Sequence, residues 1–112
     1  MIPSLVTLAL AGPLDGKTFA VTLVDPAKKA DPDTLVFASD TFESTMCKPY
    51  GFATAKYAVG KDGVVTVEAT SPTEGTARWS LTVTGEHVSG TMDWVKAGQA
   101  TVRYVVSGDL RK

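Results

Sequence analysis

The sequence is poor in the residues that build disulfide scaffolds and metal sites: it has one cysteine, Cys47, and one histidine, His87. A single chain can therefore form no internal disulfide, and it lacks the clustered Cys and His ligands of a structural zinc site. It also lacks an excess of either charge, since 11 Lys and Arg residues are balanced by 12 Asp and Glu residues. Nucleic acid as the main partner and a polybasic membrane-binding patch both require a basic excess, so we expect neither.

Long apolar stretches are also missing. The apolar run over residues 2–11 is too short to cross a bilayer as a helix, so we expect no membrane insertion. The run ends in Ala9-Leu10-Ala11, which is similar to a signal cleavage site, but no Lys or Arg precedes it. Two interpretations stay open: a first β-strand over residues 4–10, which we favour, or the remnant of a signal peptide.

The residues that are abundant favour β-strands. Thr and Val together make up 29 of the 112 residues, whereas Leu occurs only eight times. β-Branched side chains suit a pleated surface, and no window repeats apolar residues at the helical period of 3.6. We therefore predict one all-β domain over residues 1–112, an antiparallel up-and-down β-barrel of about 8–9 short strands. The expected strands are 4–10, 17–24, 34–38, 41–46, 53–59, 64–70, 76–84, 88–95 and 100–110.

The turn positions define a register for the second half of the chain. If each hairpin folds at the centre of its turn, residues 53–110 form a five-stranded antiparallel meander with one charged face and one apolar face. The charged row alternates in sign: Lys56, Glu68, Arg78, Asp93 and Arg103. The apolar face carries two rows: Tyr57, Val67, Trp79, Met92 and Tyr104, and Ala55, Ala69, Ala77, Trp94 and Val102.

Such a meander leaves two free edges and an uncovered apolar face, and no helix is predicted that would cover it. Pairing the first strand with the last would close a barrel and remove both edges. A barrel of eight strands is wide enough to be filled by side chains or to hold one small ligand. A two-sheet sandwich is the alternative architecture.

Two segments resemble the calycins, the group of lipocalin-like barrels. Residues 14–19 (LDGKTF) are similar to the lipocalin entry motif, in which a Gly is followed by Trp; here Phe19 stands in the place of Trp with one extra spacing residue. Residues 90–94 (GTMDW), together with Tyr104 and residues 108–110, resemble the last hairpin of small bacterial barrels of this kind. The chain is shorter than the usual family member and lacks its long first loop, its C-terminal helix and its disulfide. The resemblance implies binding rather than catalysis.

The apolar face supplies the candidate ligand-binding residues. Small residues on the same face, among them Ala77 and Gly90, leave room for a ligand cavity. The alternative is that the two Trp side chains fill this room and the core is solid, as in most small barrels. The candidates are Tyr57, Trp79, Met92, Trp94 and Tyr104.

One loop combines a thiol, a cation and two aromatic rings: Cys47, Lys48, Tyr50 and Phe52. We interpret it as a possible contact surface or a closure of the barrel mouth. A neighbouring Lys could lower the pKa of Cys47 and make it reactive. The alternative, which we favour, is a buried Cys that packs as a small hydrophobic residue.

The sequence contains no motif of a known catalytic or nucleotide-binding class. His87 lies at a hairpin and has no assignable catalytic partner other than Cys47; Asp31, Asp33 and Asp40 match no calcium-binding loop. We therefore expect no enzyme, no cofactor and no metal. The favoured function is a small barrel, periplasmic or secreted, that binds a small apolar ligand as a monomer or weak dimer. The alternative is a protein-interaction module, such as a protease-inhibitor-like barrel that acts through its loops.

Overall fold

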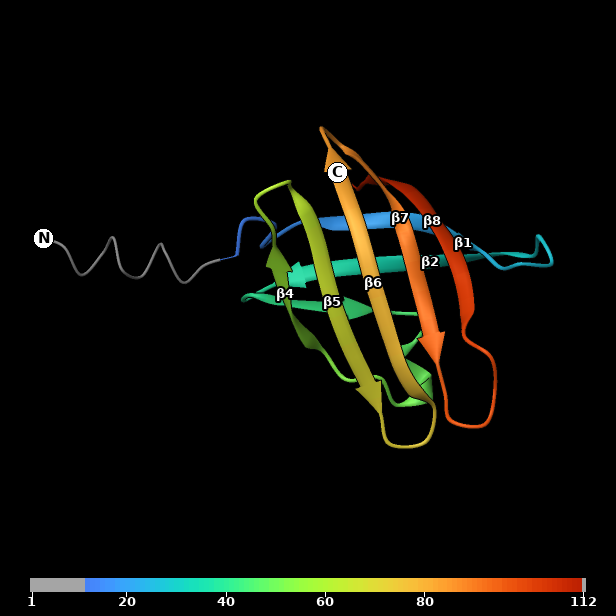
Figure 1. Cartoon of the computed structure of the whole chain (residues 1–112). Helices are drawn as coiled ribbons and strands as arrows, with labels where there is room; N and C mark the ends of the chain where they lie inside the picture. The colour runs from blue at the N-terminus through green and yellow to red at the C-terminus, as the bar shows by residue number, and fades with distance from the viewer. Residues whose placement is uncertain (1–11, 112) are drawn as a thin grey trace, which may run out of the picture.

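The computed structural model describes residues 12–111, which form a closed barrel of eight antiparallel strands (Figure 1). Each strand pairs with the next in the chain, and the first described strand pairs with the last. The prediction of an all-β up-and-down barrel is confirmed, and the sandwich alternative is wrong. The strands are β1 (Thr18–Val24), β2 (Ala30–Ala38), β3 (Thr41–Ser44), β4 (Ala55–Val59), β5 (Val64–Ser71), β6 (Gly75–Thr84), β7 (His87–Val95) and β8 (Val102–Leu110).

The register expected for the second half of the chain is confirmed across β5 to β8. Arg78 lies between Glu68 and Asp93, and Asp93 is paired in turn with Arg103. The Asp93 carboxylate accepts hydrogen bonds from Nε and Nη2 of Arg103 at 2.7 and 2.8 Å. These exposed ion pairs contribute little stability, but a shift by one residue would turn the charges inward, so they specify the register.

The barrel closes with a different strand from the one expected. The strand predicted over residues 4–10, and its alternative as a signal remnant, lie outside the described residues. β1 takes the closing position instead, and residues Phe19 to Val24 pair with residues Val105 to Leu110 of β8. Eight strands therefore suffice for closure, as expected for a barrel with a side-chain-filled interior.

β2 begins earlier than the sequence indicated. Residues 25–33 were expected as a polar loop because they contain two Asp-Pro pairs, but Ala30 to Asp33 continue the ladder with β1. Pro32, paired with Thr22, is tolerated there because β3 ends too early to pair with this part of β2. Asp31 and Asp33 consequently take the same side of β2 as the buried Leu35.

The connection from β3 to β4 is longer than expected. β3 ends at Ser44 and β4 starts at Ala55, so both are shorter than the expected strands 41–46 and 53–59. A single 3₁₀ turn, η1 (Lys48–Tyr50), lies within the connection and ends at Gly51, whose φ of +89° is accessible mainly to glycine. This long connection runs along one end of the barrel (Figure 1).

Part of the barrel interior is a solid aromatic core. Phe37 makes edge-to-face contacts with Phe19, Phe42 and Tyr57 at ring-centroid distances of 5.9, 5.3 and 5.0 Å. Trp79 extends this cluster, since its ring lies 5.0 Å from that of Phe42. Together these rings fill the width of the barrel, which is the packed arrangement expected for an eight-stranded interior.

Candidate functional site

One end of the barrel is closed by a hydrogen-bonded latch. The hydroxyl of Tyr57 donates to the Asp15 carboxylate at 2.8 Å and accepts from the Leu14 amide at 2.9 Å. The same carboxylate accepts from the Asp40 amide, and this hydrogen bond is the main cause that lowers the pKa of Asp15. Burial, followed by the bond to Asp15, raises the pKa of Tyr57 to about 12. The buried side chain of Leu14 completes the closure.

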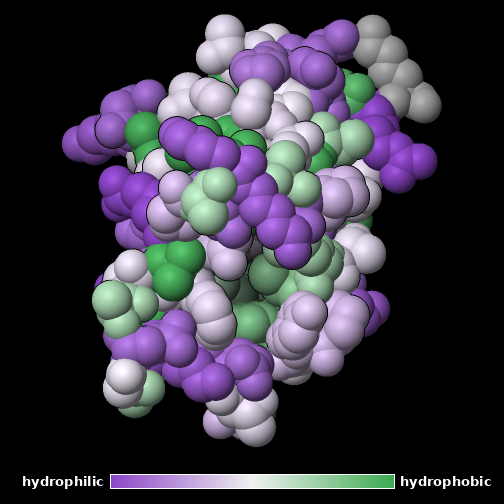
Figure 2. Space-filling view, turned by 90° about the vertical axis from the view of Figure 1, so that its right-hand side faces the viewer, coloured by the Kyte–Doolittle hydropathy of each residue, from purple (hydrophilic) through white to green (hydrophobic). Residues whose placement is uncertain are grey.

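The opposite end of the barrel contains a cavity of about 420 Å³. This is the end at which β1, β3, β5 and β7 finish and at which the connection from β3 to β4 lies. A space-filling view shows a hollow in the molecule, with hydrophobic residues at its base and hydrophilic residues around it (Figure 2). The cavity is lined by Lys29, Asp31, Met46, Cys47, Tyr50, Phe52, Glu74, Ala77, Met92, Trp94 and Tyr104.

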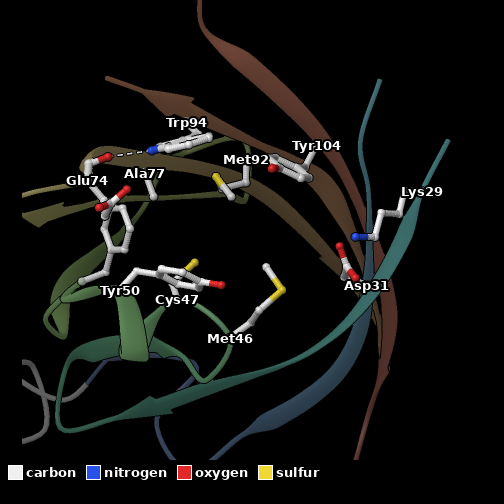
Figure 3. A pocket seen from close by; sticks show the side chains of 11 residues that line it. Lys29, Asp31, Met46, Cys47, Tyr50, Glu74, Ala77, Met92, Trp94 and Tyr104 are labelled. Carbon is white, nitrogen blue, oxygen red and sulfur yellow. Dashed lines mark hydrogen bonds between the residues drawn. The ribbon is translucent and has the colours of Figure 1, made fainter. Parts of the chain in front are cut away.

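The strand alternation explains one wall of the cavity. Met92 and Trp94 are two residues apart on β7, and Tyr104 lies beside Met92 on β8. Ala77 of β6 is the cross-strand partner of Trp94, and its small side chain leaves space inside the wall. Figure 3 shows these side chains around the cavity, with the loop residues opposite.

Trp94 is held in place by its polar atom. Its Nε1–H donates to the carbonyl of Glu74 at 2.6 Å, in the turn between β5 and β6 (Figure 3). The Glu74 carboxylate in turn forms an ion pair of 3.2 Å with Lys96. The indole therefore has its hydrogen bond satisfied by the wall, and the rest of its ring is available to an apolar ligand.

A buried polar network anchors the loop that forms the other wall. The Asp33 carboxylate, whose residue is only 7% exposed, accepts hydrogen bonds from the Ser44 hydroxyl and from the amides of Thr34 and Met46, the last two at 2.7 and 2.8 Å. Ser44 Oγ accepts from the Cys47 amide at 3.3 Å. Burial raises the pKa of Asp33 despite these donors. The network fixes Met46 and Cys47 where they face the cavity.

The five candidate ligand-binding residues fall into two groups in the structure. Met92, Trp94 and Tyr104 line the cavity, whereas Tyr57 and Trp79 lie in the solid core. Gly90 does not enlarge the cavity: a Cβ there would overlap the carbonyl oxygen of Ser80, so glycine is needed for the close approach of β6 and β7.

In the loop, Cys47, Tyr50 and Phe52 line the cavity. Lys48 instead forms an exposed ion pair with Glu43 at 3.1 Å. The idea that Lys48 activates the thiol is wrong, because burial raises the pKa of Cys47 and the residue is only 7% exposed. Cys47 therefore behaves as the buried hydrophobic residue of the alternative interpretation.

His87 and Cys47 lie at opposite ends of the barrel. His87 begins β7 beside the turn to β6, and its Nδ1 lies 3.0 Å from the Asp109 carboxylate. No Cys–His pair is formed between them. Within residues 12–111 no three His, Cys, Asp or Glu residues are grouped so that they could hold a metal ion. No helix in the same range has the length and apolarity needed to cross a membrane.

Sequence reasoning missed part of the lining. Lys29 and Asp31 were placed in a loop, although the alternation of Asp31, Asp33, Leu35 and Phe37 continues the inward-facing side of β2 and would have located Asp31. Met46 carried no such signal, because it precedes an irregular segment. Comparison with protein-family models, curated proteins and solved structures found no match.

Proposed function

We propose that this protein is a small calycin-like barrel that binds a small apolar molecule in the cavity at its open end and has no catalytic activity. The observation that carries the proposal is the contrast between the two ends: one is closed by the Tyr57 latch, and the other holds a cavity of about 420 Å³ with an aromatic and thioether lining. Ligand pockets commonly measure about 300–1,000 Å³ and are mostly apolar with a few polar groups.

The volume limits the size of the ligand. At about 30 Å³ per water molecule of liquid, the cavity corresponds to roughly 14 such volumes. A compact ligand of about 10–15 non-hydrogen atoms therefore fits within the cavity. Trp94 and Met92 supply a flat and a deformable contact surface for an aromatic or branched body.

A cavity-filling variant tests the proposal. Ala77→Leu would place about three extra carbon atoms in the cavity and should abolish binding of a neutral probe, such as 3-phenylpropan-1-ol, measured by calorimetry or by NMR shifts. Ala58→Leu is the matched control, because it adds the same atoms to the exposed face of β4. Equal probe affinity in the native protein, Ala77→Leu and Ala58→Leu would show that binding does not use the cavity, and absence of binding in all three would contradict the proposal.

The alternative of a protein-interaction module has less support. Of the four loop residues, Cys47 and Phe52 are buried, and Tyr50 is the exposed aromatic residue at 61%. A protease-inhibitor-like loop would present several exposed side chains. We extend the proposal to a bacterial protein that is periplasmic or secreted; this part rests on the sequence features and is tested by cell fractionation.

A further inference from the structure

The cavity contains a carboxylate that the protein itself does not neutralise by contact. Asp31 lies on the inward-facing side of β2 and lines the cavity. Within the described part of the chain, its side chain has no hydrogen bond and no ion pair, whereas Asp33 is held by three donors and Glu74 is paired with Lys96. The Asp31 carboxylate is therefore an acceptor in the cavity lining that is available to a ligand.

Two aromatic rings lie along one wall of the cavity, on the side that contains this carboxylate. Tyr104 lies beside the Asp31 side of the cavity, and Trp94 lies further along the same wall (Figure 3). The pKa of the Tyr104 hydroxyl is raised, first by burial and then by the negative charges of Asp25 and Asp31. The negative charges of Asp25 and Asp31 are thus both felt at the Tyr104 hydroxyl. The negative face of an aromatic ring also attracts a cation.

Lys29 is the competing positive charge. Its side chain reaches the cavity beside Asp31 (Figure 3), and Lys29 is an exposed residue just before β2. Within the described residues Lys29 and Asp31 form no ion pair, so the Lys29 ammonium lies beyond ion-pair distance of the Asp31 carboxylate. Across residues 25–31 the two carboxylates of Asp25 and Asp31 are matched by the two ammonium groups of Lys28 and Lys29, so the preference for a cation rests on the unpaired Asp31 carboxylate in the cavity lining and not on the net charge of this side.

We propose that the ligand is an organic cation, with an ammonium group that binds Asp31 and an apolar body that packs against Met92 and Trp94. This inference rests on the proposed function, since it specifies the chemistry of the same site. Lys29 leaves the Asp31 carboxylate unpaired, and its long, exposed side chain can stay in solvent when the ammonium of the ligand binds there.

Three probes of nearly equal shape test the inference: 3-phenylpropylamine, 3-phenylpropan-1-ol and 3-phenylpropionate. The amine should bind about tenfold more tightly than the alcohol, because a charge-assisted hydrogen bond in a half-buried site contributes about one order of magnitude. The carboxylate probe should bind most weakly. An alcohol or a carboxylate that binds as tightly as the amine would overturn the inference and leave the proposed function intact, whereas failure of all three probes would contradict the proposed function as well.

Variants assign the charge preference to particular residues. Asp31→Asn should weaken amine binding by roughly tenfold and change alcohol binding by less than about twofold. Lys29→Met should strengthen amine binding, because it removes the competing ammonium. Glu68→Gln is the matched control: it also removes one negative charge, but from the exposed outer face of β5. Equal effects of Asp31→Asn and Glu68→Gln would show a long-range effect of net charge only and would overturn the assignment.

Discussion

Two tryptophans on neighbouring strands allow the difference between the barrel halves to be measured as stability. Trp79 on β6 is 2% exposed and packs against Phe42, so its surroundings are solid on all sides. Trp94 on β7 is only partly buried and has the cavity on one side. Truncation to Ala should therefore have unequal costs, although the two side chains are chemically identical.

The expected magnitudes follow from these surroundings. Trp79→Ala should lower the free energy of unfolding by about 3–5 kcal/mol, the usual cost of removing a fully buried aromatic side chain. Trp94→Ala removes less buried area and one hydrogen bond to the Glu74 carbonyl, which itself contributes about 1 kcal/mol. We expect a total cost of about 1.5–2.5 kcal/mol for Trp94→Ala.

Urea unfolding followed by far-ultraviolet circular dichroism measures both costs without relying on tryptophan fluorescence. If Trp79→Ala does not fold, the milder pair Trp79→Phe and Trp94→Phe repeats the comparison, again with the larger loss at Trp79. Equal losses at the two positions would refute the reasoning, because they would mean that Trp94 is packed on all sides and that no cavity adjoins it.

Three further predictions concern the polar groups. Burial raises the pKa of Asp33 in the folded state above its ordinary value of 3.8, so its contribution to the free energy of unfolding should fall as the pH rises from about 4 through the folded-state pKa. Urea titrations across this pH range should therefore show a flatter pH dependence of stability in Asp33→Asn than in the native protein. An unchanged slope would contradict the assignment. Tyr57→Phe should lower the free energy of unfolding by about 1–2 kcal/mol, since it removes both hydrogen bonds of the latch. The Tyr104 hydroxyl has no hydrogen bond within residues 12–111, so Tyr104→Phe should cost less than about 0.5 kcal/mol. Equal costs in thermal or urea unfolding would argue against the latch. Cys47 should react with a thiol reagent at least about tenfold more slowly in the folded than in the urea-unfolded protein, and rapid reaction of the folded protein would show that the thiol is not buried.

The sequence was most informative where side-chain period and turn position agree. From β5 to β8, the turns at residues 72–74, 85–86 and 96–101 are short, and the charges of Glu68, Arg78, Asp93 and Arg103 alternate from strand to strand. A single register satisfies both signals, because any slip by one residue would bury charges. Closure into a barrel followed from the need to cover the apolar face, but the sequence did not show that β1 is the strand that pairs with β8.

The sequence left a ligand cavity and a solid core as alternatives, and the position and extent of the cavity could not be predicted because they depend on long-range closure and on an irregular loop. The sequence placed Trp79 and Trp94 on one face, but only the three-dimensional structure shows that Phe42 packs against Trp79, whereas Trp94 lines the cavity. Two Asp-Pro pairs are typical of loops, so the extension of β2 that brings Asp31 to the cavity was missed. The Asp33–Ser44 bond joins residues of two strands and has no local sequence signal.

The most direct test of the central claim is an NMR titration of the ¹⁵N-labelled protein with 3-phenylpropan-1-ol, because amide and indole shifts report where a neutral apolar probe binds. The claim predicts saturable shifts at the open end, at Met46, Cys47, Met92, the Trp94 indole and Tyr104, with the Trp79 indole and the Tyr57 latch unchanged. Absence of shifts up to the solubility limit, or shifts centred on the outer charged face or the closed end, would contradict it.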